Sequence, residues 1–356
     1  MKKPLFNVPS TLAALVAAVS LCTTGMAQAQ ANDLTMRVAG NYSSNVKHSD
    51  GIERPFFTGL PQSSGVAMNV RFNPMDVVNV KAEDALRLLR SNIFDVMSVQ
   101  IGQVARDDPF FEGIDLAGVA PNMATLRGSV DAYREAFDKR LQEKFKAKVL
   151  TLWPFGPQVF FCNKPIKSLA DFKGLKVRSF TPSMSAMLQN IGATPVSLAF
   201  SEVYSALSHG VIDCGVTSPN SGNAGKWPEV TQYFYPLAVS GSVQGHFVNL
   251  SFWNKLSPEQ QAKISAEFKK MENQMWELAE SGTADSINCN TGKECKGGTP
   301  FKMTLVPVSA DDEAKIKAAS SATVLPMWRD TCNKVDPKCS ATWNATVGKA
   351  RGLSIN

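Results

Sequence analysis

Apolar stretches and alternating polar and apolar positions predict strands separated by helices along the first half of the chain. Four strands are predicted, over residues 34–39, 66–72, 94–99 and 147–153. Helices are predicted over residues 82–89 and 132–145, and the third strand ends at Gln100. Strands that alternate with helices indicate an α/β fold. A crossover near residues 153–158 then leads to a strand over 159–162, and we place the first domain boundary there.

One strand in the second half places an arginine at the edge of a sheet. Residues 168–172 predict a helical turn that Gly174 can end in a left-handed conformation, and residues 175–180 follow as a strand. Ligands of open α/β sheets bind outside the carboxyl ends of the strands, where Arg178 would lie. Arg178 is therefore the first candidate for a ligand contact.

The same alternation continues beyond this strand. Residues 194–198 and 211–216 predict two more strands, and the helix between them is expected to be capped by Ser201 and ended by Gly210. This order favours a mostly parallel sheet.

The longest predicted helix begins at Ser257. Ser257-Pro258-Glu259-Gln260 is a capping box with proline at the first helical position. Apolar residues follow at spacings of four and three, at Ile264, Phe268, Met271, Met275 and Leu278. At about 1.5 Å per residue the helix would exceed roughly 30 Å, which is enough to lie across two small domains. A core helix of one domain would give the same pattern.

The composition indicates a globular protein, and the N-terminal segment indicates that it is exported. Its 356 residues, 44% hydrophobic and 19% charged, are typical of a soluble protein, and the length favours two domains. Lys2 and Lys3 precede an apolar run over residues 12–21, so we expect a cleaved signal peptide over residues 1–31. That run is too short to anchor the protein in a membrane.

The charge of the chain argues against nucleic acid as a partner. Loss of Lys2 and Lys3 with the signal peptide would lower the formal net charge from +6 to about +4. The remaining basic residues are dispersed and do not cluster with aromatic residues.

Six of the seven cysteines follow the predicted signal peptide, and an even number in an oxidising compartment favours disulfides. Local pairs are expected between Cys289 and Cys295 and between Cys332 and Cys339. Cys162 and Cys214 lie on predicted strands of one domain and could pair or remain buried thiols. Zinc is the alternative, but no CxxC spacing or nearby histidine supports it.

Catalytic signatures are scarce. The chain has no GxSxG, HExxH or P-loop motif, and no GxGxxG between a strand and a helix. Of its three scattered histidines, His209 beside Gly210 is most simply the end of a helix. Asp107 and Asp108 precede a proline in a predicted turn, where capping or solvent exposure is simpler than an acid–base pair. We therefore expect neither an enzyme nor a cofactor.

Three stretches of the sequence resemble one family of receptors: LADFKGLKVR, GATPVSLAFSEVYSALSHGVID and FWNKLSPEQQ. In the order and spacing of these motifs the chain resembles the periplasmic solute receptors of tripartite ATP-independent periplasmic (TRAP) transporters, typified by C4-dicarboxylate receptors. The resemblance extends over nearly the whole mature chain and is strongest between Val149 and Gln261. The cysteine-bearing stretches 286–300 and 328–343 look like additions.

The resemblance implies an α/β, two-domain periplasmic-binding-protein fold with a hinge, crossing strands and one long helix that spans both domains. Domain I is then expected over residues 32–154 and 243–280, and domain II over residues 155–242 and 281–356, with the ligand cleft between them. The implied function is a periplasmic receptor, commonly monomeric, that delivers a small organic carboxylate to a TRAP membrane permease.

The resemblance also implies a ligand-binding role for Arg178, which falls on the arginine of the family's K-[VIL]-R strand and would form a bidentate pair with a ligand carboxylate. Physical chemistry agrees, because a guanidinium in a cleft without an acidic partner costs free energy until an anion arrives, and ligand binding then favours closure. Without the resemblance, a salt bridge to Asp171 or Glu202 would be the default.

Other ligand-binding positions are carried over with less support from the residues themselves. They are Asn41, Gln100, Gln158, Thr217 and Ser218, with Trp153 and Phe200 as candidates to line an apolar part of the cleft. The alternatives are a turn role for Asn41, capping of the helix after Pro219 for Thr217 and Ser218, and core packing for the aromatic residues.

Two departures from the family pattern narrow the ligand. Gln158 stands where receptors for sugar acids have a second arginine, which disfavours a ligand that needs two. Val216 stands in the region where keto-acid receptors have a cation-binding glutamate, which disfavours a metal-bridged ligand. A receptor for another carboxylate uptake system, a sensor subunit and a secreted enzyme remain as alternative functions.

Overall fold

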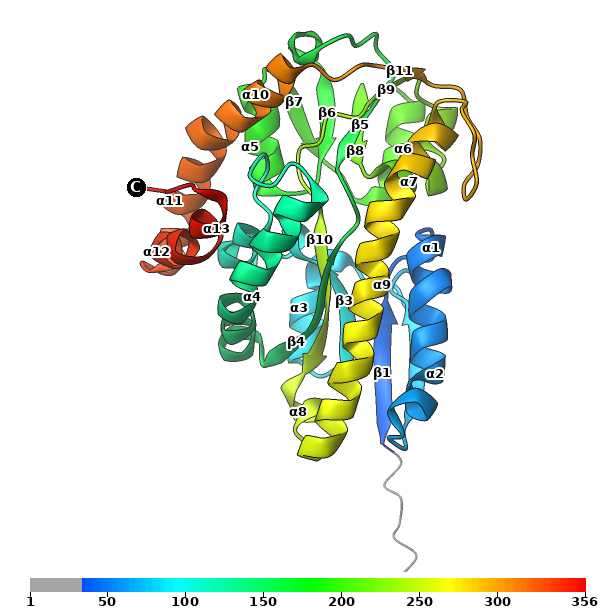
Figure 1. Ribbon diagram of the computed structural model, residues 1–356, viewed down its shortest axis with the longest axis vertical. Helices are drawn as coiled ribbons and strands as arrows, with labels where there is room; N and C mark the ends of the chain where they lie inside the picture. Colours follow the sequence, from blue (N-terminus) through cyan, green and yellow to red (C-terminus); the bar gives the residue numbers. More distant parts are fainter. Residues whose placement is uncertain (1–33) are drawn as a thin grey trace, which may run out of the picture. The chain divides into compact units, whose positions relative to one another are not determined.

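The computed structural model describes residues 34–356, in which two β-sheets are surrounded by helices (Figure 1). The signal peptide predicted over residues 1–31 lies outside the described residues. Within residues 34–356 no helix has both the length and the apolarity needed to cross a membrane.

The first sheet has the strand order β2–β1–β3–β10–β4. Its strands are β1 (Thr35–Gly40), β2 (Asn69–Pro74), β3 (Val96–Gln100), β4 (Ala147–Pro154) and β10 (Val243–Asn249). β1 pairs in parallel with β2 and β3, whereas β10 runs antiparallel to β3 and β4. The carboxyl ends of β1, β2 and β3 therefore lie at one edge.

The second sheet has the strand order β11–β9–β5–β8–β6–β7. Its strands are β5 (Val159–Cys162), β6 (Lys176–Ser179), β7 (Thr194–Ser197), β8 (Cys214–Thr217), β9 (Tyr233–Tyr235) and β11 (Thr304–Leu305). β6 pairs in parallel with β7 and β8, but β5 is antiparallel to β8 and β9. The α/β class is confirmed, and so is the expectation of a mostly parallel sheet, because β5 is the one reversed strand of the second sheet and β10 the one reversed strand of the first. The chain enters both of these strands from the other sheet and not through a helical crossover.

Two crossing segments connect the sheets and pair with each other. The Phe155 N–H donates to the Ser242 carbonyl at 3.1 Å, the Gln158 N–H donates to the Ser240 carbonyl at 2.8 Å, and the Val239 N–H donates to the Gln158 carbonyl at 2.9 Å. These hydrogen bonds fix the registry of the two crossings where the chain passes between the sheets.

Helices surround both sheets. Those in the first part of the chain and after β10 are α1 (Val46–His48), η1 (Ser49–Glu53), α2 (Arg54–Ser64), η2 (Ala82–Asp84), α3 (Ala85–Arg90), η3 (Ile101–Gln103), η4 (Pro109–Ile114), α4 (Met123–Phe145) and α8 (Leu250–Trp253). Those between β5 and β9 are η5 (Leu169–Phe172), α5 (Pro182–Asn190), α6 (Phe200–Ser208), α7 (Pro219–Ala224) and η6 (Trp227–Glu229). The remaining helices are α9 (Pro258–Asn290), α10 (Ala310–Ala319), η7 (Ser320–Val324), α11 (Leu325–Val335), α12 (Cys339–Trp343), η8 (Asn344–Gly348) and α13 (Lys349–Arg351).

The start of α6 differs from the expectation. Ser201 was predicted to cap this helix, but the N-cap is Ala199. Alanine has no side-chain acceptor for the N–H groups of the first turn, but the Glu202 carboxylate accepts the Ala199 N–H at 2.9 Å, which is the other half of a capping box.

The long helix α9 packs against elements of both sheets, as predicted (Figure 1). Its 33 residues extend for about 50 Å at about 1.5 Å per residue. Ser257 caps it, and the indole N–H of Trp276 donates to the Leu152 carbonyl of β4 at 2.9 Å. At its other end the Asn290 side chain donates to the Pro219 carbonyl at the start of α7, at 3.0 Å. Of the predicted stripe, Leu278 alone is only half-buried.

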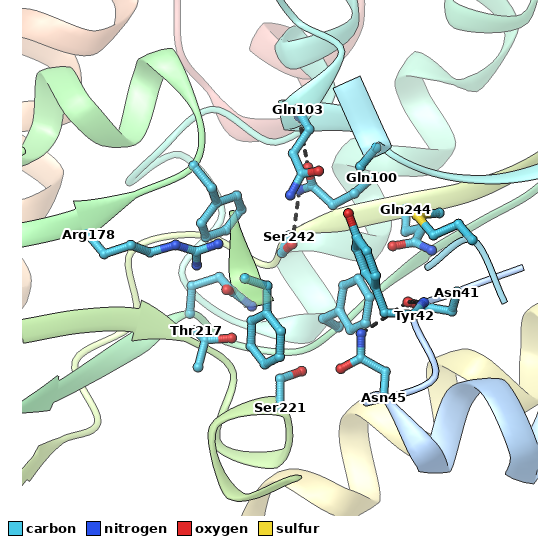
Figure 2. Close-up of a pocket in the computed structure, with 16 residues that line it drawn as sticks. Asn41, Tyr42, Asn45, Gln100, Gln103, Arg178, Thr217, Ser221, Ser242 and Gln244 are labelled. Carbon is cyan, nitrogen blue, oxygen red and sulfur yellow. Dashed lines mark hydrogen bonds between the residues drawn. The ribbon is translucent and has the colours of Figure 1, made fainter. Parts of the chain in front are cut away.

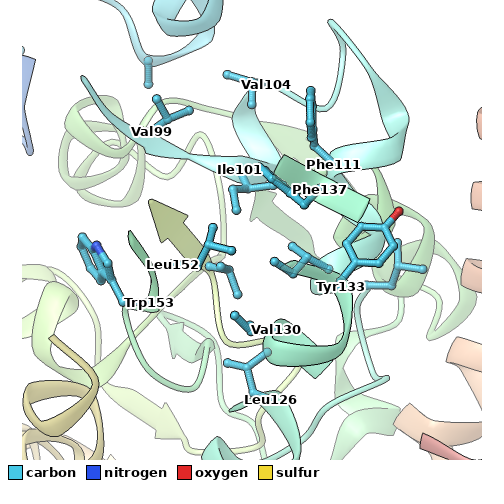
Figure 3. Packing of buried hydrophobic residues seen from close by; sticks show 14 of the residues in the cluster. Val99, Ile101, Val104, Phe111, Leu126, Val130, Tyr133, Phe137, Leu152 and Trp153 are labelled. Carbon is cyan, nitrogen blue, oxygen red and sulfur yellow. The ribbon is translucent and has the colours of Figure 1, made fainter. Parts of the chain in front are cut away.

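The core beside the first sheet is built by α4 (Figure 3). Leu126, Val130 and Phe137 of this helix are fully buried, together with Val99 of β3 and Leu152 of β4. Close packing of this kind fixes the strands whose ends reach the crossing segments.

All six cysteines after residue 33 form disulfides. Cys162 and Cys214 lie opposite each other on β5 and β8 and are bonded, which settles the alternative that the sequence left open. The two local pairs, Cys289–Cys295 and Cys332–Cys339, are confirmed.

The last helices pack on elements near the start of the chain. The indole N–H groups of Trp328 and Trp343 donate to the carbonyls of Pro109 and Gly113 in η4, each at 2.8 Å.

The bounds of the two expected domains stay a prediction.

Candidate functional site

A cavity lies where the carboxyl ends of the parallel strands of both sheets approach the crossing segments, and its empty volume is about 500 Å³ (Figure 2). Its lining residues are Asn41, Tyr42, Asn45, Met75, Ala82, Gln100, Gln103, Phe155, Gln158, Arg178, Phe180, Phe200, Thr217, Ser221, Ser242 and Gln244. Strand ends of α/β sheets commonly form ligand sites.

Arg178 reaches the cavity from the end of β6 and is 2% exposed. Its Nε–H donates to the Leu198 carbonyl at 3.1 Å, and Nη1 donates to the Val216 carbonyl at 2.7 Å. The guanidinium carbon lies 4.4 Å from the centre of the Phe180 ring, within cation–π distance. Backbone carbonyls and an aromatic ring therefore orient the guanidinium without neutralising it.

Burial lowers the pKa of Arg178 to about 9, because a buried cation loses its hydration. The two acids that could have formed its salt bridge act elsewhere: Asp171 accepts the N–H groups of Lys167 and Ser168, and Glu202 caps α6. Within residues 34–356 no carboxylate pairs with Arg178, and Arg178 is the only charged residue among those that line the cavity.

Asn41 follows β1, and its backbone N–H is hydrogen-bonded to the buried acid Glu53. The Glu53 carboxylate accepts the Asn41 N–H at 2.7 Å and, through its other oxygen, bonds His246 Nε2 at 2.8 Å. Thr151 and the Trp153 indole N–H approach His246 Nδ1, so Nδ1 accepts and Nε2–H donates to Glu53. This chain of hydrogen bonds ties the cavity wall to the core of the first sheet.

Two predicted glutamines also line the cavity. The Gln100 side chain donates to Ser242 Oγ at 3.1 Å and accepts the Gln103 N–H at 2.8 Å (Figure 2). Gln158 lies on the first crossing segment and donates from its side chain to the Gly156 carbonyl at 2.9 Å. Both amides therefore have fixed orientations where the two sheets approach each other.

Of the other predicted positions, two line the cavity and two do not. Thr217 and Phe200 are lining residues, and Phe200 stacks on Trp227 at 5.3 Å between ring centres. Ser218 is the N-cap of α7, where its hydroxyl accepts the Ser221 N–H at 3.1 Å. Trp153 is fully buried in the core of the first sheet.

Several lining residues were not predicted from the sequence: Tyr42, Asn45, Gln103, Ser221, Ser242 and Gln244. Ser242 precedes β10 with a positive φ of 55°, and Gln244 is the second residue of that strand, so strand alternation alone does not place both at the cavity. Tyr42 and Asn45 belong to the turn after β1, whose course the pattern of the sequence does not determine.

A smaller cavity adjoins this one at Gln100 and contains two acids. The Glu112 carboxylate accepts the Ser183 N–H at 2.8 Å, and the Asp115 carboxylate accepts the N–H groups of Gly241 and Val243 at 3.1 and 3.3 Å. Burial raises the pKa of Glu112 and raises that of Asp115 to about 7. These acids therefore hold the second crossing segment and the start of α5.

The cavity beside Arg178 suits non-covalent binding of an anion. Its lining offers one buried cation surrounded by neutral amides, hydroxyls and aromatic rings, and it contains no cysteine, histidine or carboxylate. In the described part of the chain no group of three or more histidine, cysteine or acidic side chains is placed to hold a metal ion.

Comparison with known proteins gives a consistent result. The family model for bacterial extracellular solute-binding proteins of family 7 (DctP) matches residues 60–329. The chain is 28% identical over 182 residues to a sialic acid-binding periplasmic protein of Vibrio cholerae, a match that covers 48% of this chain and 54% of that protein. It is 33% identical over 129 residues to a C4-dicarboxylate-binding periplasmic protein of Rhodobacter capsulatus, a match that covers 33% of this chain and 37% of that protein. The chain therefore spans about half the length of the first relative and less of the second.

Among solved structures, a Bordetella pertussis extracytoplasmic solute receptor that binds pyroglutamic acid, DctP6, superimposes with a TM-score of 0.77 at 20% identity. The superposition covers 90% of this chain and 100% of that receptor. At this identity the likeness establishes the fold.

Proposed function

Because the chain belongs to family 7 of the bacterial extracellular solute-binding proteins, we propose that it captures a small organic carboxylate in the periplasm and delivers it to the permease of a TRAP transporter. A family of solute-binding proteins is not a family of enzymes, and the secreted-enzyme alternative is set aside on that ground. Two of the proteins named above are periplasmic and the third is an extracytoplasmic receptor, and the ligands in their names, sialic acid, a C4-dicarboxylate and pyroglutamic acid, are all carboxylates.

One observation supports the proposal above all others: Arg178 is a buried cation without an acidic partner in the described residues, and it lines the cavity. A ligand carboxylate that pairs with the guanidinium supplies the counter-charge that the protein itself does not provide. Asn41, Gln100, Gln158 and Thr217 would contact the uncharged remainder of the ligand.

The two crossing segments support a hinge between the expected domains, over residues 32–154 with 243–280 and over 155–242 with 281–356. The carboxylate contacts Arg178 beside the second sheet, while Asn41 lies beside the first, so a bound ligand bridges the two. Binding would therefore favour the closed arrangement that a permease recognises, and we propose that the receptor acts as a monomer.

The proposal is tested on protein purified from the periplasm without denaturation. Denaturation should release an organic acid, about one per chain, whose mass is unchanged after long incubation with the protein. Release of a cation or an uncharged sugar in its place would contradict the proposal, and steady conversion of the acid would restore the enzyme alternative.

The transport partner is tested separately in vesicles that contain TRAP permease subunits. Uptake of the labelled acid should require this receptor and an ion gradient. Binding without uptake by any permease subunits from the same genome would favour a receptor for another uptake system or for a signalling protein.

A further inference from the structure

Two buried asparagines on the cavity wall each leave one polar atom without a partner. Asn41 is 1% exposed and Asn45 is 6% exposed, and both line the cavity. Within the described residues, Asn41 Nδ2 and Asn45 Oδ1 have no hydrogen-bond partner. Figure 2 shows both asparagines on the opposite side of the cavity from Arg178. A buried polar group without a partner costs about 1 to 3 kcal/mol of stability, and a ligand that bonds these two atoms would offset that cost.

Neighbouring hydrogen bonds fix which atom of each amide is free. Asn41 Oδ1 accepts the backbone N–H of Tyr42 at 2.9 Å, and a backbone N–H can only donate. The Asn41 oxygen is therefore engaged and its NH₂ group remains. Asn45 Nδ2 donates to the same oxygen at 3.0 Å, which leaves the Asn45 oxygen free. The free atoms are thus one donor and one acceptor on adjacent, mutually bonded amides.

The Asn45 side chain does not cap the helix that follows it, although Asn45 is the N-cap residue of α1. Asparagine at this position normally accepts a backbone N–H from the first turn. Here the side chain bonds Asn41 instead.

The remainder of the wall limits the charge of the ligand. Arg178 supplies one positive charge, and every other lining residue is neutral. A second carboxylate on the ligand would have no cation to meet, and an ammonium group would have no acid. The ligand that complements the cavity carries a single negative charge and, away from it, a neutral group that both accepts and donates a hydrogen bond.

We propose that this receptor selects a monocarboxylate with an amide or lactam edge, whose carbonyl accepts from Asn41 Nδ2 and whose N–H donates to Asn45 Oδ1. A primary amide or a ring amide presents its C=O and N–H on the same side, which matches a donor and an acceptor on neighbouring side chains. This inference rests on the proposed carboxylate-binding function and specifies the other end of its ligand.

A ring-acid series tests the proposal by calorimetry on the wild-type protein. L-pyroglutamate carries the carboxylate and the lactam edge, 5-oxotetrahydrofuran-2-carboxylate keeps the carbonyl but lacks the N–H, and tetrahydrofuran-2-carboxylate lacks both the carbonyl and the N–H. Proline and glutarate add an ammonium and a second carboxylate, respectively. We expect the lactam to bind about tenfold more tightly than the lactone, and the remaining three acids to bind more weakly still.

Asn41→Ala and Asn45→Ala extend the test to the protein side. Each should weaken lactam binding about tenfold or more and change binding of tetrahydrofuran-2-carboxylate less than threefold. Asn273→Ala, an exposed asparagine on α9, is the matched control and should change neither affinity. Thermal unfolding verifies that the variants fold, and if they do not, the ligand series on the wild-type protein decides alone.

The outcomes separate this inference from the function on which it rests. If glutarate or tetrahydrofuran-2-carboxylate bound as tightly as the lactam, and Arg178→Met abolished that binding, the amide inference would be wrong and carboxylate capture would stand. If none of the five acids bound, the amide inference would also be overturned. A wider panel of carboxylates would then test the proposed function independently.

Discussion

Replacing Arg178 by methionine should remove carboxylate binding without strongly destabilising the ligand-free protein. Truncating one partner of a desolvated, hydrogen-bonded charge pair costs about 2 to 5 kcal/mol of binding free energy. This corresponds to a loss of affinity of about 30-fold to several thousand-fold at 25 °C. A methionine side chain fills similar space but carries no charge.

The stability of the ligand-free variant follows from opposing effects. The lowering of the pKa of Arg178 from its usual value to about 9 corresponds to a penalty of about 5 kcal/mol for holding the charge in the cavity wall. The substitution relieves this penalty but leaves the carbonyls of Leu198 and Val216 without their donors, at about 1 to 3 kcal/mol each. We therefore expect a net change between a stabilisation of about 3 kcal/mol and a destabilisation of about 1 kcal/mol.

The assays are calorimetry with the tightest-binding carboxylate of a panel and denaturant unfolding without ligand. Arg90→Met, an exposed arginine at the end of α3, is the matched control and should change neither quantity. If Arg178→Met kept wild-type affinity, or if it destabilised the ligand-free protein by more than about 4 kcal/mol, the reasoning would be refuted, because Arg178 would then be a structural residue.

The pH dependence of binding follows from the same residue. A bound carboxylate favours the protonated guanidinium and raises the pKa of Arg178 again, so binding takes up a proton above about pH 9. Affinity should stay constant between about pH 6 and 8 and fall about tenfold per pH unit above 9. A flat profile up to pH 11 would contradict the buried, unpaired state of Arg178.

Three further predictions concern the support of the site. The pKa of Asp115 is raised from 3.8 to about 7, so the native state retains the proton and the free energy of unfolding should fall by at most about 4 kcal/mol as the pH rises from about 4 to 7. Asp115→Asn should make this fall with pH less steep. Equal pH slopes for the variant and the wild type in urea unfolding would contradict the assignment. Replacing Cys162 and Cys214 together by serine opens a cross-strand link 52 residues apart in sequence and should cost about 2 to 5 kcal/mol in the same assay, whereas a loss below 1 kcal/mol would contradict a structural role. Glu53→Gln places an NH₂ group against one of the two donors that the carboxylate accepts, either the Asn41 N–H or the His246 N–H, so both stability and carboxylate affinity should fall. Unchanged affinity would show that Glu53 does not position the cavity wall.

The elements that the sequence predicted well are those with strong local signals. The capping box at Ser257 and the apolar stripe after it located α9, and the run at 159–162 matches β5. Arg178 was located by a strand motif and by its lack of an acidic neighbour. In each case residues close in sequence determine the structure.

Elements that depend on distant contacts were missed. The helix α2 contains Gly59 and Pro61, which weaken its local signal, and it is stabilised by burial of Phe57 and Leu60 against the sheet. The unpaired donor and acceptor of the cavity wall arise from the turn after β1, which a pattern of residue types does not resolve. The antiparallel strands β5 and β10 follow from crossings between sheets that no local period records.

The most direct test of carboxylate capture is titration calorimetry of the wild-type protein against a panel of small organic acids, each paired with its neutral primary amide. At least one acid should bind with one site per chain at micromolar affinity or tighter, and its amide should bind at least 30-fold more weakly. An amide that bound as tightly as its acid, or a panel in which no acid bound, would contradict the account.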